Sequence, residues 1–210
     1  MIAADLAFPI LSMLIAVPAA GAGIIVLLSK RRPELMKLVA ALASVVTAAM
    51  SVWLTAEFDQ ADDGFQFVSN HPWVEQWGIG WHLGVDGISL FLVLLTGLLF
   101  PLAILGIDPH NDDPGQDKPY FAWLLLLEAG VMGSFVSLDL FLFFVFFEIV
   151  LVPMYFLIGG WGYEGREYAA TKFFLYTMFG SAFMLVSIMA TAFIGSRNGV
   201  GEVTFDLVRL

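Results

Sequence analysis

Six apolar stretches of about 20 residues each constrain the fold of this chain more than any other feature of its sequence. A helix of that length matches the roughly 30 Å hydrocarbon core of a bilayer. The sequence is 60% hydrophobic and 13% charged, against about 25% charged in an average soluble domain. Alternating apolar and polar segments, which are typical of membrane β-barrels, are absent. The sequence therefore predicts an all-α polytopic membrane protein.

We expect six transmembrane helices in two regions, residues 1–118 and residues 119–210. The first region contains three helices and a hydrophilic, acidic loop at 57–83, whose Trp73, Trp77 and Trp81 suit a membrane interface. The segment 107–119 has three prolines and four aspartates, which predicts irregular structure. The predicted helices cover residues 6–28, 36–56, 84–106, 119–136, 138–159 and 168–194.

The distribution of Lys and Arg predicts the orientation of the chain. The loops after the first, third and fifth helices hold seven of these residues and the other side holds two. Because cytoplasmic loops are enriched in Lys and Arg, we expect an outer N-terminus and a multi-pass protein. The seven are Lys30, Arg31, Arg32, Lys37, Lys118, Arg166 and Lys172, and the two are Arg197 and Arg209.

The residue types that bind redox cofactors are scarce. Cysteine is absent, so thiolate-ligated iron–sulfur clusters are excluded in this chain. The three histidines, His71, His82 and His110, all fall in predicted loops or at a helix boundary, which disfavours a haem held between membrane helices. We therefore expect no metal site and no cofactor in the chain itself.

One acid, Glu148, lies near the middle of the apolar stretch 137–160. A carboxylate at that depth costs about 2.5–3.5 kcal/mol on insertion scales and is usually retained for a function. Five residues later, Pro153 has no N–H, so the carbonyl of Ile149 loses its helical partner. A titratable group beside a weakened helical turn, inside lipid, is our first candidate for a proton-carrying site.

A second acid, Glu128, lies in the preceding predicted helix. The turn around Ser137 is so short that the two helices must be antiparallel neighbours. Both acids then lie roughly 14–17 Å from that turn, at nearly the same depth. Two carboxylates there cannot both be ionised cheaply without a cation or water nearby. The alternative is that one or both are protonated and have no role, because the apolar residues of the helix outweigh the cost of one acid.

Three other charged residues have simpler explanations. Lys172 lies near the cytoplasmic start of the sixth helix, where its side chain can extend to the interface. Its depth differs from that of Glu148 by roughly 10 Å, so a direct pair is not expected, although water could relay a proton between them. Asp86 and Asp139 begin helices on the outer side, where a carboxylate stabilises the helix N-terminus.

Three motifs resemble the antiporter-like membrane subunits of respiratory complex I, the proton-pumping NADH:quinone oxidoreductase. They are GVDGISLFLVLLTGLL from Gly84, FFEIVLVPMYFLIGGWG from Phe146 and ATKFFLYT from Ala170. The resemblance implies a larger helical bundle with two inverted repeats, of which this chain holds the N-terminal part. Residues 119–210 would then begin the first repeat. Related cation/proton antiporters and membrane-bound hydrogenases share parts of the pattern.

The resemblance also implies a function. Such subunits translocate protons, driven by quinone reduction elsewhere in the complex, and the motif glutamate, here Glu148, pairs with a lysine on a broken helix. It also places the motif lysine, here Lys172, among the residues of proton translocation, and Glu128 is our third candidate. NADH, flavin, iron–sulfur clusters and quinone would be bound by other subunits of a complex in the bacterial inner membrane. The alternatives are a subunit of a cation/proton antiporter or hydrogenase, and a structural scaffold between membrane subunits.

Overall fold

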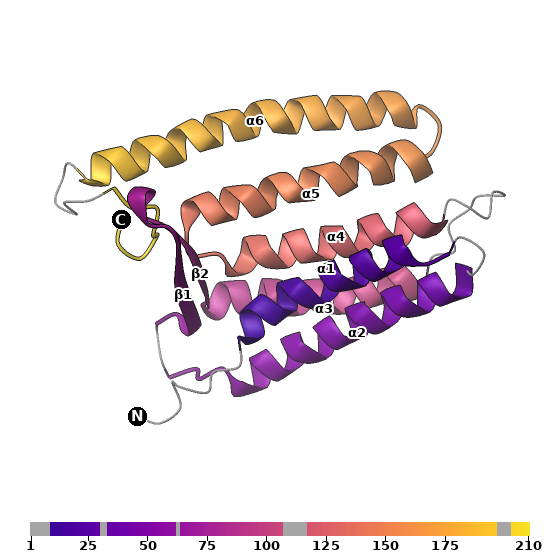
Figure 1. The fold of residues 1–210 in the computed structure, drawn as a ribbon, viewed down its shortest axis with the longest axis horizontal. Helices are drawn as coiled ribbons and strands as arrows, with labels where there is room; N and C mark the ends of the chain where they lie inside the picture. Colours follow the sequence, from indigo (N-terminus) through magenta and orange to yellow (C-terminus); the bar gives the residue numbers. More distant parts are fainter. Residues whose placement is uncertain (1–8, 30–32, 62–63, 107–116, 197–202) are drawn as a thin grey trace.

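The computed structural model describes residues 9–29, 33–61, 64–106, 117–196 and 203–210. Its six long helices lie side by side, and each is long and apolar enough to cross a membrane (Figure 1). The predicted all-α membrane fold is thereby confirmed, with helix ends shifted by a few residues. Residues 6–8 and most of the loop before residue 119 lie outside the described residues. The helices are α1 (Ile10–Leu27), α2 (Pro33–Glu57), α3 (Gly87–Gly106), α4 (Asp117–Val136), α5 (Leu140–Trp161) and α6 (Arg166–Gly195).

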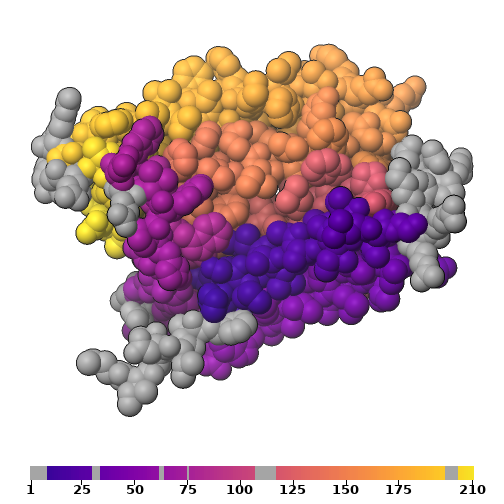
Figure 2. Space-filling view, in the orientation of Figure 1, coloured from indigo at the N-terminus to yellow at the C-terminus, as the bar shows by residue number. Residues whose placement is uncertain are grey.

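Helix α4 forms the centre of the bundle. It contacts α1, α2, α3 and α5, and apolar side chains around its whole circumference are buried. Helix α6 packs on α5 at the edge of the bundle and leaves Tyr176, Phe179 and Phe183 exposed. The α5–α6 layer, orange to yellow, forms one side of the molecule in Figure 2. The bundle therefore has a packed centre around α4 and an open apolar face on α6.

Two glycines allow α4 and α5 to approach closely. A Cβ atom on Gly133 would overlap the ring of Phe146, and one on Gly130 would lie 2.9 Å from Cγ2 of Val150. Between the two helices the chain has only three residues, 137–139. The expected antiparallel pairing of the two acid-bearing helices is confirmed.

The acidic loop 57–83 contains a feature that the sequence did not predict. Strands β1 (Gln66–Val74) and β2 (Ile79–Val85) form an antiparallel hairpin, with a short 3-10 helix, Glu75–Trp77, at its tip. Strand β1 is mostly exposed and contains Pro72, so it lacks the apolar alternation of a half-buried strand. Reading this region as a loop, and the third helix as beginning at residue 84, was therefore wrong.

The hairpin also holds the turn between α4 and α5. Within the turn, the N–H of Leu138 donates to the carbonyl of His82 in β2 at 2.8 Å. On the other side, the N–H of Leu207 donates to the carbonyl of Leu138 at 2.9 Å. Residues 137–139 thus lie between β2 and the segment 203–210, an arrangement that we call the turn clamp (Figure 1).

Gly78 completes this end of the molecule, which we call the hairpin end. Its φ of +64° lies in the left-handed region, and a Cβ atom there would overlap the carbonyl oxygen of Val203. Trp73 and Trp77 are exposed on the hairpin, as expected for side chains at an interface. Trp81 instead donates its indole N–H to Oγ of Ser12 in α1 at 3.0 Å.

The close approach of α4 and α5 yields a stability prediction. Gly133→Ala should destabilise the protein by about 1–3 kcal/mol, because the stiff Phe146 ring must move to admit the new methyl group. Gly23→Ala is the matched control, since no described residue outside its own stretch of helix backbone has an atom within 4 Å of the position of its Cβ. The melting temperature of the full-length chain in detergent measures both. A Gly133→Ala protein that melts with the Gly23→Ala protein would contradict this packing.

Candidate proton site

Glu148 lies in α5 and is half-buried. Its Oε1 atom is fully buried and has no hydrogen-bond partner among the described residues. Tyr155 follows two helical turns later on the same face, and its ring meets that of Phe174 in α6 at 5.4 Å between centroids. Glu148 is therefore on the side of α5 that faces α6. A buried carboxyl oxygen without a partner is costly in a stable structure and is typical of a group that binds a proton or another ligand.

Glu128 is completely buried and has a partner on a different helix. Its Oε1 accepts a hydrogen bond from Oγ of Ser44 in α2 at 3.0 Å, whereas its Oε2 has no partner in the described part of the chain. The hydroxyls of Thr47 and Ser51, on the same face of α2, donate to carbonyls of their own helix. The contact of Ser44 with Glu128 was not predicted, because the sequence around a serine in an apolar helix does not indicate which neighbouring helix it contacts.

The two acids have the same depth but different neighbours. Glu128 lies eight residues before the end of α4 and Glu148 eight residues after the start of α5. Both are therefore about 12 Å along the helix axis from the turn. No hydrogen bond joins the two carboxyl groups in the described residues, since Glu128 bonds to α2 and Glu148 faces α6. The structure brings Glu128 to Ser44 and leaves Glu148 as a separate site.

Lys172 lies on the exposed face of α6. Its Nζ is 5.8 Å from the centroid of the Tyr168 ring, one turn earlier, and it borders a shallow apolar groove with Leu175 and Phe179. It is six residues into α6, whereas Glu148 is thirteen residues from the adjoining end of α5. Their depths differ by about 10 Å. The structure does not bring Lys172 to Glu148.

Pro153 is buried within α5, which continues through it to Trp161. The helix therefore continues although Pro153 has no N–H to donate to the carbonyl of Ile149. Transmembrane helices tolerate such a proline when neighbouring groups compensate for the lost hydrogen bond. Among the described residues, no cluster of three or more His, Asp or Glu side chains is arranged to hold a metal ion.

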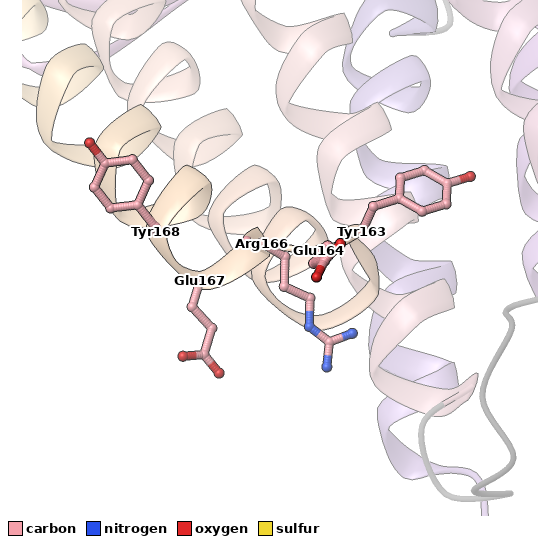
Figure 3. A pocket seen from close by; sticks show the side chains of 7 residues that line it. Tyr163, Glu164, Arg166, Glu167 and Tyr168 are labelled. Atoms are coloured by element: carbon pink, nitrogen blue, oxygen red, sulfur yellow. The ribbon is translucent and has the colours of Figure 1, made fainter.

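The loop between α5 and α6 borders a second hollow, of about 610 Å³. Arg166 and Glu167 extend outward to the same side, while Tyr163 and Tyr168 lie on opposite sides of the loop (Figure 3). Tyr163 and Tyr168 are also exposed. An open surface with charged side chains extended away from the helices fits the boundary between the membrane and water better than a ligand site.

At the hairpin end, both expected helix caps are confirmed. Oδ1 of Asp139 accepts the N–H groups of Phe141 and Leu142 at 2.9 and 3.0 Å. Oδ1 of Asp86 accepts the N–H of Ser89 at 2.8 Å, and the Ser89 hydroxyl donates toward the backbone of Asp86. The N–H of Ser89 lowers the pKa of Asp86, whereas burial raises the pKa of Asp139.

Comparisons with known proteins agree on one family. Residues 137–205 match the family described as NADH:quinone oxidoreductase/Mrp antiporter, TM. NADH-quinone oxidoreductase subunit M of Mycobacterium tuberculosis is 39% identical, over 94% of this chain and 40% of that protein. The Rickettsia bellii protein of the same name is 44% identical, over 72% of this chain and 30% of that protein. The chain thus spans well under half the length of these relatives.

Solved structures agree on the fold. A chain of respiratory complex I from Thermus thermophilus with bound NADH superposes with a TM-score of 0.74 at 24% identity. The match covers 95% of this chain and 38% of that one. A chain of the Mrp complex from Dietzia has a TM-score of 0.66 at 19% identity, over 92% of this chain and 20% of that one. The six-helix arrangement is therefore shared with larger antiporter-like bundles.

The contact between Ser44 and Glu128 predicts a coupled pair. Ser44→Ala should destabilise the full-length protein by about 1–3 kcal/mol, because a buried carboxyl group loses its only hydrogen-bond donor among the described residues. The double variant Ser44→Ala/Glu128→Leu should cost less than the sum of the two single changes. Thr47→Ala is the control, since Thr47 bonds only within α2. Additive shifts in melting temperature would show that the two side chains do not interact.

The cap at the start of α3 predicts a pH dependence. Because the folded pKa of Asp86 is lowered, its stabilisation is present above its ordinary value of 3.8 and is lost as the pH falls through the folded value. Amide hydrogen exchange at Ser89 should therefore accelerate on acidification beyond the change in intrinsic rate. In Asp86→Ala, exchange at Ser89 should be fast at every pH. Equal protection in both proteins would contradict the cap.

Proposed function

Because the chain belongs to the family of membrane subunits that NADH:quinone oxidoreductases share with Mrp antiporters, we propose that it is part of a proton-translocating subunit of NADH:quinone oxidoreductase. In this proposal quinone reduction elsewhere in the complex drives the transfer, and NADH, flavin, iron–sulfur clusters and quinone are bound by other subunits. The partners are the other membrane-arm subunits, and the location is the bacterial inner membrane.

The observation that carries the proposal is the carboxyl group of Glu148. It lies within a span long enough to cross a membrane, inside the segment that matches the family, and one of its oxygens is buried without a partner among the described residues. A carboxyl group at this position does not improve the packing, because burying an apolar side chain of similar size would cost less free energy. Binding and releasing a proton gives the carboxyl group a reason to be present.

The proposed mechanism is an electrostatic switch. In one state Glu148 is ionised beside a cationic side chain, and in the other the cation has moved away and the carboxyl group holds a proton. A low-dielectric site makes the difference between the two states large, because an unpaired charge there is not compensated by water. Lys172, exposed and about 10 Å away in depth, is better suited to relay protons near the membrane surface than to be that cation.

The charge distribution suggests the orientation of the chain, and in this proposal the pump moves protons from the cytoplasm to the outer side. Lys118 and Arg166 lie at the end of the bundle opposite the hairpin. There, Nζ of Lys118 donates a hydrogen bond to the carbonyl of Leu28. Since cytoplasmic loops are enriched in Lys and Arg, we assign this end to the cytoplasm and the hairpin end to the outer side. Protons would therefore reach Glu148 from the end near Pro153 and leave toward the hairpin.

Similarity favours the oxidoreductase over the antiporter. The relatives named subunit M are 39–44% identical to the chain, whereas the Mrp chain is 19% identical and supports the fold alone. Sodium dependence of transport would indicate the antiporter. A scaffold without transport predicts that changes at Glu148 leave turnover intact.

The test is Glu148→Gln in the full-length subunit within its assembled complex. We expect NADH-driven proton pumping to fall at least tenfold, because the amide keeps the shape of the side chain and cannot bind a proton. Glu148→Asp should retain part of the activity, since it keeps the carboxyl group. Pumping and quinone reduction are measured in membrane vesicles, and assembly is checked on a native gel.

Wild-type pumping and quinone reduction in an assembled Glu148→Gln complex would refute the proposal. Loss of assembly in Glu148→Gln, together with normal assembly in Glu148→Asp, would assign the carboxyl group to structure instead. Glu128→Gln is the matched comparison at the same depth, and we expect a smaller effect because its carboxyl group is already bonded to Ser44.

A further inference from the structure

Three ionisable side chains converge at the hairpin end, outside the proposed Glu148 site. They are His82 in β2, Asp139 in the turn before α5, and Asp206 in the segment 203–210. His82 and Asp139 are buried, with 7% and 1% of their surfaces exposed. Ionisable groups are rarely buried together without a pairing or a function.

Asp139 and Asp206 are directly opposite each other across the turn clamp. Their residues form an antiparallel bridge, flanked by the hydrogen bonds from Leu140 to Phe205 and from Leu207 to Leu138, at 2.8 and 2.9 Å. Side chains of such a pair have Cβ atoms about 4.5–5.5 Å apart. Like charges directly opposite each other are destabilising, and two adjacent carboxylates tend to hold one proton between them.

The remaining contacts of Asp139 fix its carboxyl group in place. Oδ2 accepts the N–H of Gly80 in β2 at 3.0 Å, while Oδ1 caps α5. Burial raises the pKa of Asp139, these N–H bonds lower it, and the charge of Asp206 raises it again. The carboxyl group therefore links the hairpin, the start of α5 and the second acid.

His82 provides the third group. Its Nδ1 lies 3.3 Å from Oδ1 of Asp206. This distance suits an ion pair, although the angles between the two groups are not those of a hydrogen bond. Three other ionisable residues that the structure describes at this end lie outside the cluster: His71 and Arg209 are exposed, and Asp86 is bonded to Ser89. His82 is thus positioned to balance one of the two carboxylates when both are ionised.

We propose that Asp139 and Asp206, with His82 beside them, form a proton-binding site at the hairpin end of α5. The two carboxyl groups hold one proton, which is exchanged with water at that end. Loss of this proton leaves two carboxylates opposite each other, with His82 as the nearby cationic group and backbone N–H groups as their hydrogen-bond donors. The repulsion between the carboxylates weakens the turn clamp at the start of the helix that carries Glu148. The inference rests on the proposed function only in taking the hairpin end as the side to which protons are released.

The test is infrared spectroscopy of the assembled complex during a pH titration, which detects protonated carboxyl groups directly. We expect a protonated-carboxyl band in the wild type that is absent from Asp139→Asn. In Asp206→Asn the remaining carboxyl group should require at least a tenfold higher proton concentration to become protonated, because the opposing charge has been removed. Asp86→Asn is the control: it also changes a helix cap at this end and should leave the band unchanged.

Asparagine is itself a favourable helix cap, so Asp139→Asn can keep the acceptor at the start of α5 while it removes the titrating group and the second acceptor, which binds the N–H of Gly80. If Asp139→Asn fails to assemble, Asp206→Asn decides, since Asp206 does not cap a long helix. A band that titrates identically in Asp206→Asn and the wild type overturns the inference. Glu148→Gln separates the two proposals: normal pumping in that variant would refute the proposed function, while the band at Asp139 would still support this site.

Discussion

The three-residue turn between α4 and α5 is the constraint on which the rest of this structure depends. It forces the two helices to be antiparallel neighbours, and Gly130 and Gly133 allow them to pack closely. The turn is paired on both sides, with β2 and with the segment 203–210, so the start of α5 is fixed by backbone hydrogen bonds. The position of Glu148 in the membrane follows from this anchoring.

The two acids at equal depth differ in how their burial is compensated. Glu128 is completely buried in the most enclosed helix of the bundle and bonds to Ser44 of α2. Glu148 is half-buried on the side of α5 that faces α6, with one oxygen unpartnered. In the described part of the chain each acid has one buried carboxyl oxygen without a partner, but the hydrogen bond from Ser44 holds Glu128 in one arrangement. Glu148 has no such bond among these residues, so its carboxyl group is stabilised when it binds a proton or when a cation lies beside it. The second behaviour is what proton transfer requires.

Much of the fold could be predicted from the sequence, because the bilayer limits the choices. Apolar length identified the six helices, and the short turn identified α4 and α5 as neighbours. Asp86 and Asp139 were recognised as helix caps, since the chemistry of a cap is local. The hairpin was missed because β1 is mostly exposed and is stabilised by pairing with β2, which is not visible in local periodicity.

The contacts that define the sites depended on tertiary structure. Ser44 and Glu128 are 84 residues apart, and nothing in the sequence near either residue indicates the other. The same holds for His82, Asp139 and Asp206, which come from a strand, a turn and the segment 203–210. The equal depth of the two acids was predicted from helix length alone, but the faces on which they lie required the packing of α2 and α6.

The central claim, that Glu148 carries the transferred proton, is tested most directly by infrared difference spectra of the assembled complex between the resting state and NADH-driven turnover. If Glu148 carries the proton, the difference spectrum contains a signal from a protonated carboxyl group. This signal persists in Glu128→Gln and disappears in Glu148→Gln. A signal that persists in Glu148→Gln and disappears in Glu128→Gln would contradict it and assign the proton to the acid bonded to Ser44.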